Sequence, residues 1–333
     1  MFKRDITESI LYAAKYYPVI TITGPRQSGK TTLAKSLFPD KQYISLEDPD
    51  MREFATKDPR GFLDVYKDGA IIDEVQHCPE LFSYIQTKVD LDGVNGQFIL
   101  TGSQNFLLLA KVSQSLAGRV GIIHLLPLSY SEISSKINLE NNPNNLIYKG
   151  FYPKLYKTDL SPSVWYRDYI RTYIERDVRQ MKNITDLVAF QTFLKICAGR
   201  VGQLINFSSI STECGISYNT IKSWLSVLQT SFIIYMLKPH HKNFNKRLVK
   251  QQKLYFYDTG LACSLLGIES PDQLQTHYAR GALFENMVIM EILKNRLNSG
   301  KEEGLYFWRD NHGHELDILI DDKELTFQSD ISH

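Results

Sequence analysis

The chain has 333 residues, 43% hydrophobic and 23% charged, with a formal net charge of +1, so no overall field draws it to nucleic acid or to an anionic membrane. Its four cysteines are scattered without zinc-ligand spacing, which excludes a disulfide scaffold and indicates free thiols in a reducing cytosol. The sequence shows neither a signal peptide nor an apolar run of membrane-spanning length, so we predict a cytoplasmic protein of two or three domains that does not enter a membrane.

The first strong motif is a glycine-bounded loop between an apolar, β-branched run at residues 19–23 and a helix-forming stretch at residues 32–38. Its pattern, G-x-x-x-x-G-K-[ST], is that of a phosphate-binding loop, and a strand before it and a helix after it are the setting the motif requires. The glycines let backbone N–H groups point at phosphate oxygens, the lysine supplies a positive charge, and the threonine offers a hydroxyl to Mg²⁺. The expected nucleotide-binding residues are Gly24, Pro25, Arg26, Gln27, Ser28, Gly29, Lys30, Thr31 and Thr32.

A second motif is the short apolar run at residues 69–72, which ends in two carboxylates, Asp73 and Glu74. Ligands of parallel sheets lie beyond the carboxyl ends of the strands, so we expect this acid pair beside the phosphate-binding loop. Asp73 is predicted to hold Mg²⁺ together with Thr31, and Glu74 to orient the water that attacks ATP. Lys30 is expected to act in catalysis as well as in binding.

Two further polar sites follow. The strand at residues 97–100 runs into small polar residues, of which Ser103 or Gln104 is expected to contact the γ-phosphate or its water. Arg119 stands at the end of a helix-like pattern, and two roles for it stay open. It stabilises a γ-phosphate, in its own chain or in a neighbour's, or it pairs with a local carboxylate or caps a helix.

Strands at residues 19–23, 43–46, 69–72, 97–100 and 120–126 alternate with helical stretches, which predicts an α/β fold with a doubly wound parallel sheet of the P-loop NTPase kind. With these motifs in place, residues 24–32, 71–74, 100–105, 115–120 and 126–129 resemble bacterial and archaeal AAA-type ATPases. The resembling proteins carry a C-terminal domain of unknown function, whose signatures match residues 169–178, 255–261 and 281–286. The resemblance spans nearly the whole chain; the loop is specific for nucleotide, whereas the other signatures identify the family without assigning a task.

The middle of the chain predicts a helical region. Residues 134–149 are polar and turn-prone, which indicates a boundary or a loop. Residues 165–181 show an apolar helical stripe, with arginines elsewhere on the helix at 167, 171, 176 and 179. These arginines contact nucleotide or DNA, with Arg176 the foremost candidate, or they pair with neighbouring acids on a solvated face.

Residues 208–229 are expected to form a helix–turn–helix, capped by Ser208 or Ser209 and turning at residues 214–217. Its second helix should bury Ile221, Trp224, Leu225 and Leu228. Runs at 232–237 and 254–257 then predict two wing strands around a basic stretch at 238–253. Either this winged helix grips DNA phosphates, or it only packs on the ATPase domain or on another protein.

The tail predicts a helix at 282–297 and strands at 305–308 and 315–320, an order that resembles the restriction-endonuclease-like fold. That resemblance implies a Mg²⁺ site of a helical acid, a strand aspartate and an E-x-K triplet. Glu285 and Asp317 match the first two positions, but residues 328–330 read Gln-Ser-Asp where the triplet should fall. We therefore predict a partial, vestigial nuclease-like domain that does not cut DNA.

Together these patterns predict an AAA-type ATPase domain at 1–135, a helical lid and winged-helix region at 136–270, and a degenerate nuclease-like domain at 271–333. The expected activity is hydrolysis of ATP with Mg²⁺, coupled to a DNA or protein client. The alternative is a slow nucleotide-gated switch that presents the winged helix to DNA or to a partner. The sequence leaves the oligomeric state open, a homo-oligomer included.

Overall fold

The computed structural model describes residues 1–103, 115–139, 142–174, 186–240, 251–310, 313–322 and 326–329. The chain divides into two compact units: unit 1 is Met1–Leu128 with Leu297–Lys301, and unit 2 is Ser129–Arg296 with Glu302–His333. The first division lies near the boundary expected at residue 135. Unit 2 contains both regions that the sequence predicts as separate domains.

Unit 1 is built on a parallel sheet of five strands, β1 (Val19–Thr23), β2 (Gln42–Ser45), β3 (Ala70–Asp73), β4 (Phe98–Gly102) and β5 (Val120–His124). Their order is β2-β3-β4-β1-β5, and every neighbouring pair is parallel. This confirms the predicted P-loop NTPase fold. The carboxyl ends of β1, β3 and β4 therefore meet at one edge of the sheet, which is where the polar motifs follow.

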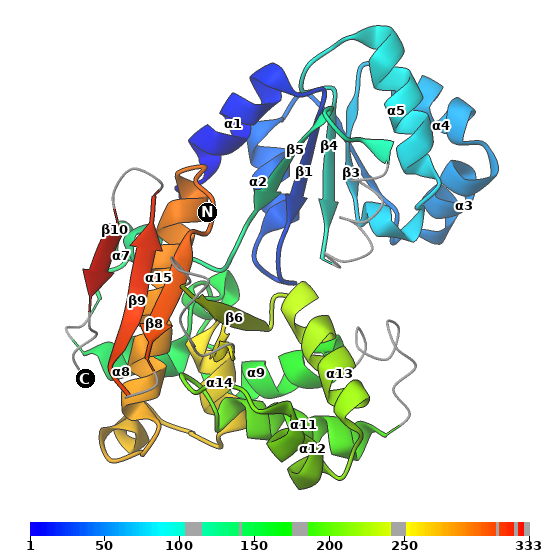
Figure 1. Ribbon diagram of the computed structural model, residues 1–333. Coiled ribbons are helices and arrows are strands. Elements are labelled where there is room, and N and C mark those ends of the chain that lie inside the picture. Colours follow the sequence, from blue (N-terminus) through cyan, green and yellow to red (C-terminus); the bar gives the residue numbers. More distant parts are fainter. Residues whose placement is uncertain are drawn as a thin grey trace. The chain divides into compact units, whose positions relative to one another are not determined.

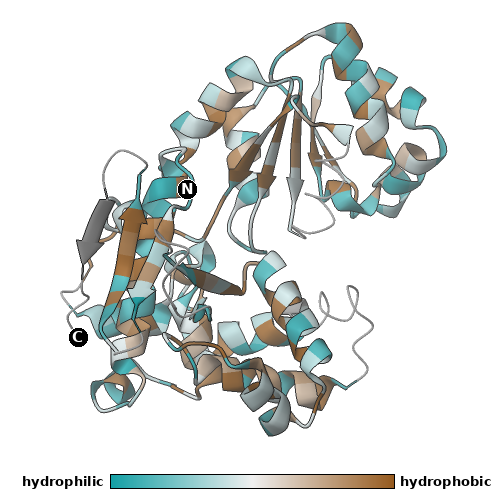
Figure 2. Cartoon of the chain, viewed as in Figure 1, coloured by the Kyte–Doolittle hydropathy of each residue, from teal (hydrophilic) through white to brown (hydrophobic). Residues whose placement is uncertain are grey.

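Helices cover both faces of this sheet (Figure 1). The first face packs on α1 (Thr7–Tyr16) and α2 (Lys30–Leu37), and the second on α3 (Pro49–Lys57), α4 (Pro59–Val65) and α5 (Leu81–Asp92). The strands are largely brown in Figure 2 because they are apolar on both sides. In β3, Ala70 and Ile72 belong to one core cluster and Ile71 to the other. This alternation explains why buried parallel strands read as continuous apolar runs in the sequence.

Unit 2 has a mixed sheet of its own, made of β6 (Ile234–Pro239), β7 (Lys253–Phe256), β8 (Leu305–Arg309), β9 (Glu315–Asp321) and β10 (Thr326–Ser329). The order is β10-β9-β8-β6-β7, with β6 and β8 parallel and the other pairs antiparallel. The two expected wing strands do pair as a hairpin, but they share this sheet with the strands of the tail. The reason is that β6 buries Ile234, Tyr235, Met236 and Leu237 in succession, so the strand needs neighbours along its length.

The helices of unit 2 lie before and between these strands. They are α7 (Tyr130–Ser134), α8 (Pro143–Lys149), α9 (Pro162–Tyr169), α11 (Leu187–Ala198), α12 (Phe207–Cys214), α13 (Tyr218–Thr230), α14 (Thr259–Leu265) and α15 (Arg280–Asn298). Short 3₁₀ turns span Val75–His77 in unit 1 and Pro153–Tyr156 and Pro271–Gln275 in unit 2. The helix expected at 165–181 runs as α9 and then as a π-helical turn, Ile170–Ile174, and residues 175–181 lie outside the described residues.

The stretch at 134–149, expected to be a boundary or a loop, forms helix α8 in its second half, where a loop does not apply. Asn142 caps this helix by accepting a hydrogen bond from the Asn144 N–H at 3.0 Å, and Pro143 occupies its first turn. Asparagine and proline favour helix starts as well as turns, so composition alone misassigned the stretch.

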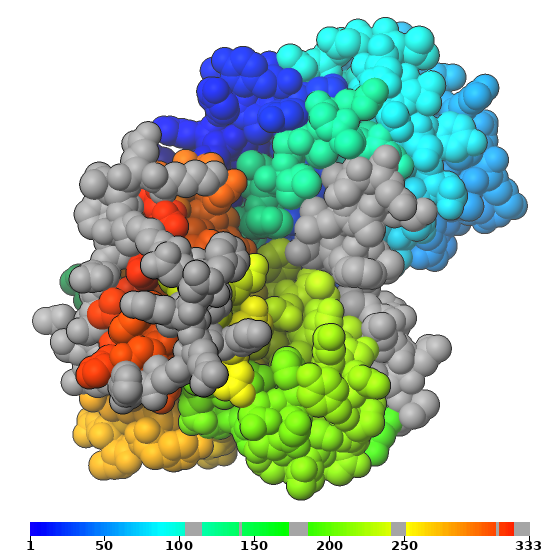
Figure 3. Space-filling view, in the orientation of Figure 1, coloured from blue at the N-terminus to red at the C-terminus, as the bar shows by residue number. Residues whose placement is uncertain are grey.

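Helices α12 and α13 occur where the helix–turn–helix was predicted and form an exposed surface of unit 2 (Figure 3). Gly215 turns the chain with a left-handed φ of 67°. The predicted inward residues of α13 are confirmed as buried: Ile221, Trp224, Leu225 and Leu228. The predicted cap is wrong, because Asn206, not Ser208 or Ser209, accepts the N–H groups that begin α12. Most of the basic stretch, residues 241–250, lies outside the described residues, so the winged-helix interpretation stays a prediction.

Candidate functional site

The phosphate-binding loop joins β1 to α2 at the carboxyl edge of the unit 1 sheet. Gly24 has a φ of 153°, and a Cβ there would lie 2.1 Å from the Leu125 carbonyl oxygen, so no side chain fits. Gly29, at φ 97°, turns the chain into the helix. The first N–H groups of a helix have no intrahelical partner, so this turn points donors into the loop. The backbone thus has the shape that binds a phosphate.

Lys30 folds over its own loop. Its ammonium donates to the carbonyl oxygens of Gly24 at 3.0 Å and Pro25 at 2.8 Å. The buried residue Arg4 stabilises the loop. Its guanidinium donates to the carbonyl oxygens of Ser28, at 2.8 Å, and Leu126, at 2.7 Å. Arg4 was not predicted, because this contact joins segments far apart in the chain.

Asp73 lies next to the loop, at the end of β3, and accepts three hydroxyl hydrogen bonds. Thr31 Oγ1 donates to Asp73 Oδ2 at 2.9 Å, and Tyr43 OH donates to the same oxygen at 2.8 Å. Thr101, on β4, donates to Oδ1. Partial burial, followed by the hydrogen bond to Asp73, raises the pKa of Tyr43 to about 12. Tyr43 also stacks under the Lys35 ammonium, which lies 3.3 Å from its ring centroid.

Neither Tyr43 nor Thr101 was predicted as a site residue. Their only signal was position along the chain: Tyr43 begins one predicted strand, and Thr101 directly follows another, without an indication of their partner. A threonine and a carboxylate in hydrogen-bond contact are the oxygen ligands that Mg²⁺ prefers, so Thr31 and Asp73 fit the metal that the fold implies.

Glu74 follows Asp73 with a left-handed backbone, φ 53°, which is uncommon for a residue with a long side chain. Its carboxylate accepts hydrogen bonds from the Gln76 side-chain amide and, at 3.2 Å, from the Ser103 hydroxyl. The unusual backbone turns Glu74 away from the Asp73 network and toward the end of β4. Gln104, the alternative to Ser103, lies outside the described residues.

Arg119 is not brought to this site. It immediately precedes β5, whose first residue pairs with the first residue of β1, so it lies at the amino edge of the sheet, opposite the loop. Its guanidinium binds Asp90 through two nitrogens, at 2.5 and 2.9 Å. Within one chain the structure therefore matches the local ion-pair alternative. Among the remaining loop residues, Arg26 lies 3.9 Å from Glu47 as an ion pair.

Of the middle arginines, Arg167 and Arg171 are exposed, and Arg167 lies 4.0 Å from Asp168. Arg176 and Arg179 fall outside the described residues. A contact of these arginines with nucleotide or DNA therefore stays a prediction.

In unit 2 the structure brings Glu285, on α15, and Asp317, on β9, around one lysine that sequence reasoning missed. Lys253 Nζ lies 3.4 Å from Glu285 Oε1 and 3.2 Å from Asp317 Oδ1, and it also pairs with Glu315. Gln328 and Ser329 belong to β10, and Asp330 lies outside the described residues. In the described part of the chain, no group of three or more His, Cys, Asp or Glu side chains is arranged to hold a metal ion.

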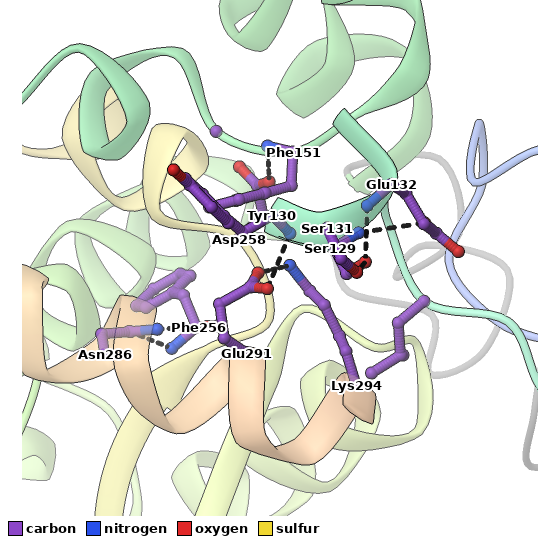
Figure 4. A network of polar contacts seen from close by, with 12 residues as sticks. Ser129, Tyr130, Ser131, Glu132, Phe151, Phe256, Asp258, Asn286, Glu291 and Lys294 are labelled. Carbon is purple, nitrogen blue, oxygen red and sulfur yellow. Dashed lines mark hydrogen bonds and ion pairs between the residues drawn. The ribbon is translucent and has the colours of Figure 1, made fainter. Parts of the chain in front are cut away.

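The family signatures of unit 2 are tied into internal contacts (Figure 4). Asp258 caps α14 through the Leu261 N–H, binds the Phe151 N–H at 2.7 Å, and accepts from the Tyr166 hydroxyl at 2.5 Å. Asn286 forms both hydrogen bonds with the Phe256 backbone, at 2.8 and 2.7 Å. These side chains hold the helices against the sheet.

A second part of this network surrounds Glu291. Its carboxylate accepts from the Tyr130 N–H at 2.7 Å and from Lys294 at 2.8 Å, while Lys294 also lies 3.7 Å from the Phe151 ring centroid. Ser129 and Glu132 form a capping box at the start of α7. The signature at residues 126–129 is therefore also a structural start signal. Throughout the described ranges, no helix has the length and apolarity needed to cross a bilayer.

Comparison with known proteins finds three matching domain families along the chain. The profile of an AAA domain matches residues 16–134, and two domains of unknown function, DUF8612 and DUF4143, match residues 140–272 and 280–328. An uncharacterized protein of Mycobacterium tuberculosis is 28% identical over 324 residues, which cover 96% of this chain and 71% of the relative. One of Haemophilus influenzae is 24% identical over 339 residues, covering 92% and 78%.

Among solved structures, the Walker-type ATPase of Pyrococcus abyssi is similar with a TM-score of 0.52 and 15% identity, over 80% of this chain and 96% of that one. At this identity the likeness supports the fold alone.

Proposed function

Because the chain is an AAA-type ATP-binding protein with a C-terminal part of unknown function, we propose that it hydrolyses ATP to ADP and phosphate with Mg²⁺. The observation that carries the proposal is the hydrogen bond from Thr31 Oγ1 to Asp73 Oδ2, at 2.9 Å. Asp73 is followed directly by Glu74, the second acid of the pair. This hydrogen bond joins the phosphate-binding loop to the acid pair at one edge of the sheet. No other polar cluster in the described residues combines a phosphate cradle with hard oxygen ligands.

The loop residues 24–31 and Thr32 would bind the phosphates of ATP through backbone N–H groups and the Lys30 ammonium. Thr31 and Asp73 would hold the metal ion, while Tyr43 and Thr101 keep the Asp73 carboxylate in one orientation. When bound, Mg²⁺ would offset the negative charge of the phosphate oxygens. To do so, Lys30 would exchange its two carbonyl contacts for phosphate oxygens.

Glu74 would accept the proton of the attacking water, and Ser103, in contact with its carboxylate, would position it. A positioned general base contributes about 10²- to 10⁴-fold to a rate. Glu74→Gln should therefore bind ATP as the wild type does and lose most of its turnover. Lys30→Ala should lose binding itself. Isothermal calorimetry and a phosphate-release assay separate the two effects, and turnover of Glu74→Gln at the parent rate would refute the assignment.

Arg119 would serve a neighbouring chain in a homo-oligomer, since within its own chain it lies opposite the loop. An arginine that stabilises transition-state charge in trans leads to a specific test. Arg119→Ala and Lys30→Ala should each be inactive, and mixing them should restore part of the activity, because some interfaces then pair an intact loop with an intact arginine. Mixed samples that stay inactive would contradict a role in trans.

The second candidate function is a slow nucleotide-gated switch, and one observation favours it. Glu74 is already engaged by Gln76, and Arg119 by Asp90, so both proposed catalytic groups would have to leave a partner before hydrolysis. The client would be DNA or a protein that contacts the region of α12 and α13. Turnover with and without duplex DNA, at increasing salt, distinguishes these outcomes. A cytoplasmic location and the absence of DNA cleavage by the tail belong to the same proposal; Mg²⁺-dependent nicking lost in Asp317→Ala would contradict the latter.

A further inference from the structure

Lys253 of unit 2 is a buried cation whose ammonium contacts more than one carboxylate. It opens strand β7, and its side chain is 4% exposed. Three carboxylates from two other elements face its ammonium: Glu285 from α15, and Glu315 and Asp317 from β9. Glu315 and Asp317 reach it together because residues two apart on a strand lie on the same face.

The surroundings of the ammonium are also polar and charged. Tyr255 donates its hydroxyl to Glu285, and Arg309 lies 3.1 Å from Glu315. Burial alone would lower the pKa of Lys253, but the facing carboxylates of Glu285, Glu315 and Asp317 outweigh it and raise the pKa. Lys253 thus stays charged at neutral pH.

From this geometry we propose that the Lys253 ammonium is the resident cation of the cluster, bound by Glu285, Glu315 and Asp317 in place of a divalent metal ion. An ammonium has three N–H donors, and three carboxylates satisfy them. The acids surround a point already filled by a positive charge, and a metal ion there would meet that charge at close range. The native protein therefore binds no Mg²⁺ at Asp317.

The ion pairs of Lys253 also join parts of the fold that are far apart in the chain. They tie β7, from the middle of the chain, to α15 and β9, from the tail, so the two regions predicted as separate domains share one ionic centre. Removal of one partner of a buried ion pair leaves uncompensated charge, and here the loss of the lysine leaves three acids facing one another. Such a site attracts an external cation.

The test is a titration of the full-length protein with Mn²⁺, followed by electron paramagnetic resonance of the free ion. Wild type and Asp317→Asn should give the same isotherm, because no metal binds at Asp317. Lys253→Met should bind one additional Mn²⁺ per chain, and Lys253→Met/Asp317→Asn should lose it. Lys253→Arg keeps the cation and should match the wild type.

Two results would overturn the proposal. One is a wild-type Mn²⁺ site that disappears in Asp317→Asn, and the other is a folded Lys253→Met that binds no additional ion. Should Lys253→Met fail to fold, the comparison of wild type with Asp317→Asn still decides, because both proteins retain the lysine. Since Asp73 is unchanged in all variants, any ion bound in unit 1 cancels in the differences.

Discussion

Substitution of Asp258 tests whether the signature at residues 255–261 has a structural or a catalytic role. The buried carboxylate of Asp258 accepts from the Phe151 N–H at 2.7 Å, the Leu261 N–H at 3.1 Å and the Tyr166 hydroxyl at 2.5 Å. Burial raises the pKa of Asp258, and the hydrogen bonds from Tyr166, Phe151 and Leu261 oppose that rise. If the residue is structural, its removal should unfold unit 2 and leave nucleotide binding by unit 1 intact.

The size of the effect follows from the three contacts. Asp258→Ala removes a helix cap, which costs about 1 kcal/mol, and leaves one backbone N–H and one hydroxyl buried without a partner, at about 1–3 kcal/mol each. We expect a loss of about 3–7 kcal/mol, a large part of the stability of a typical domain. Asp258→Asn should lose about half as much, because either orientation of the amide sets its NH₂ against one backbone N–H.

The assay uses the positions of the tryptophans. All three, Trp165, Trp224 and Trp308, lie in unit 2, so urea unfolding followed by tryptophan fluorescence reports on that unit alone. Calorimetry with ATP reports on unit 1 in the same preparation. An unchanged urea midpoint in Asp258→Ala, together with lost turnover, would refute the structural reasoning and assign Asp258 to the chemistry.

Two further predictions concern unit 1. Gly24→Ala should weaken ATP binding by about tenfold or more, because its Cβ would lie 2.1 Å from the Leu125 carbonyl oxygen. The control is Gly118→Ala, which is also at positive φ but has open space around its Cβ. Equal ATP affinities of the two variants would contradict the steric argument. The hydrogen bond from Arg119 lowers the pKa of Asp90, so the folded state binds the carboxyl proton less readily than the unfolded state does. The ion pair therefore stabilises the folded protein above the ordinary carboxyl pKa, and this stabilisation is lost as the pH falls through the lowered pKa. Asp90→Asn should therefore lower the urea midpoint followed by circular dichroism at pH 7, and its difference from the wild type should shrink as the pH falls from the ordinary carboxyl pKa through the lowered value. A difference that stays constant over this range would contradict the linkage.

The loop and the acid pair were predictable because their signals are local. A phosphate-binding loop needs a few residues in a fixed order, and the apolar runs around it predict parallel strands whose carboxyl ends coincide. The contact between Thr31 and Asp73 follows from that arrangement. Arg4 and Tyr43 were not predictable in the same way, since their partners lie far along the chain and nothing beside them in sequence indicates those partners.

Unit 2 shows where local interpretation fails. The runs at 232–237 and 254–257 do form a hairpin, which the sequence predicted, but a pattern within one segment does not say which other strands will border it. Strand β6 pairs with β8, which belongs to the tail and begins about seventy residues after β6 does. Lys253 belonged to a basic stretch in the sequence, and only the fold shows that it faces acids rather than solvent.

The signature residues of unit 2 differ from those of unit 1 in what their polar atoms do. The polar atoms of Asp258 and Asn286 form hydrogen bonds with neighbouring backbone and side chains. Those of Glu285 contact Lys253 and Tyr255. Groups committed in this way have little left to offer a substrate, because each would have to break a buried contact first. These three residues thus serve the architecture of unit 2. Recognition of the proposed client would come from other side chains, and the exposed Asn219 and Lys222 of α13 are polar groups of this kind on the surface of unit 2.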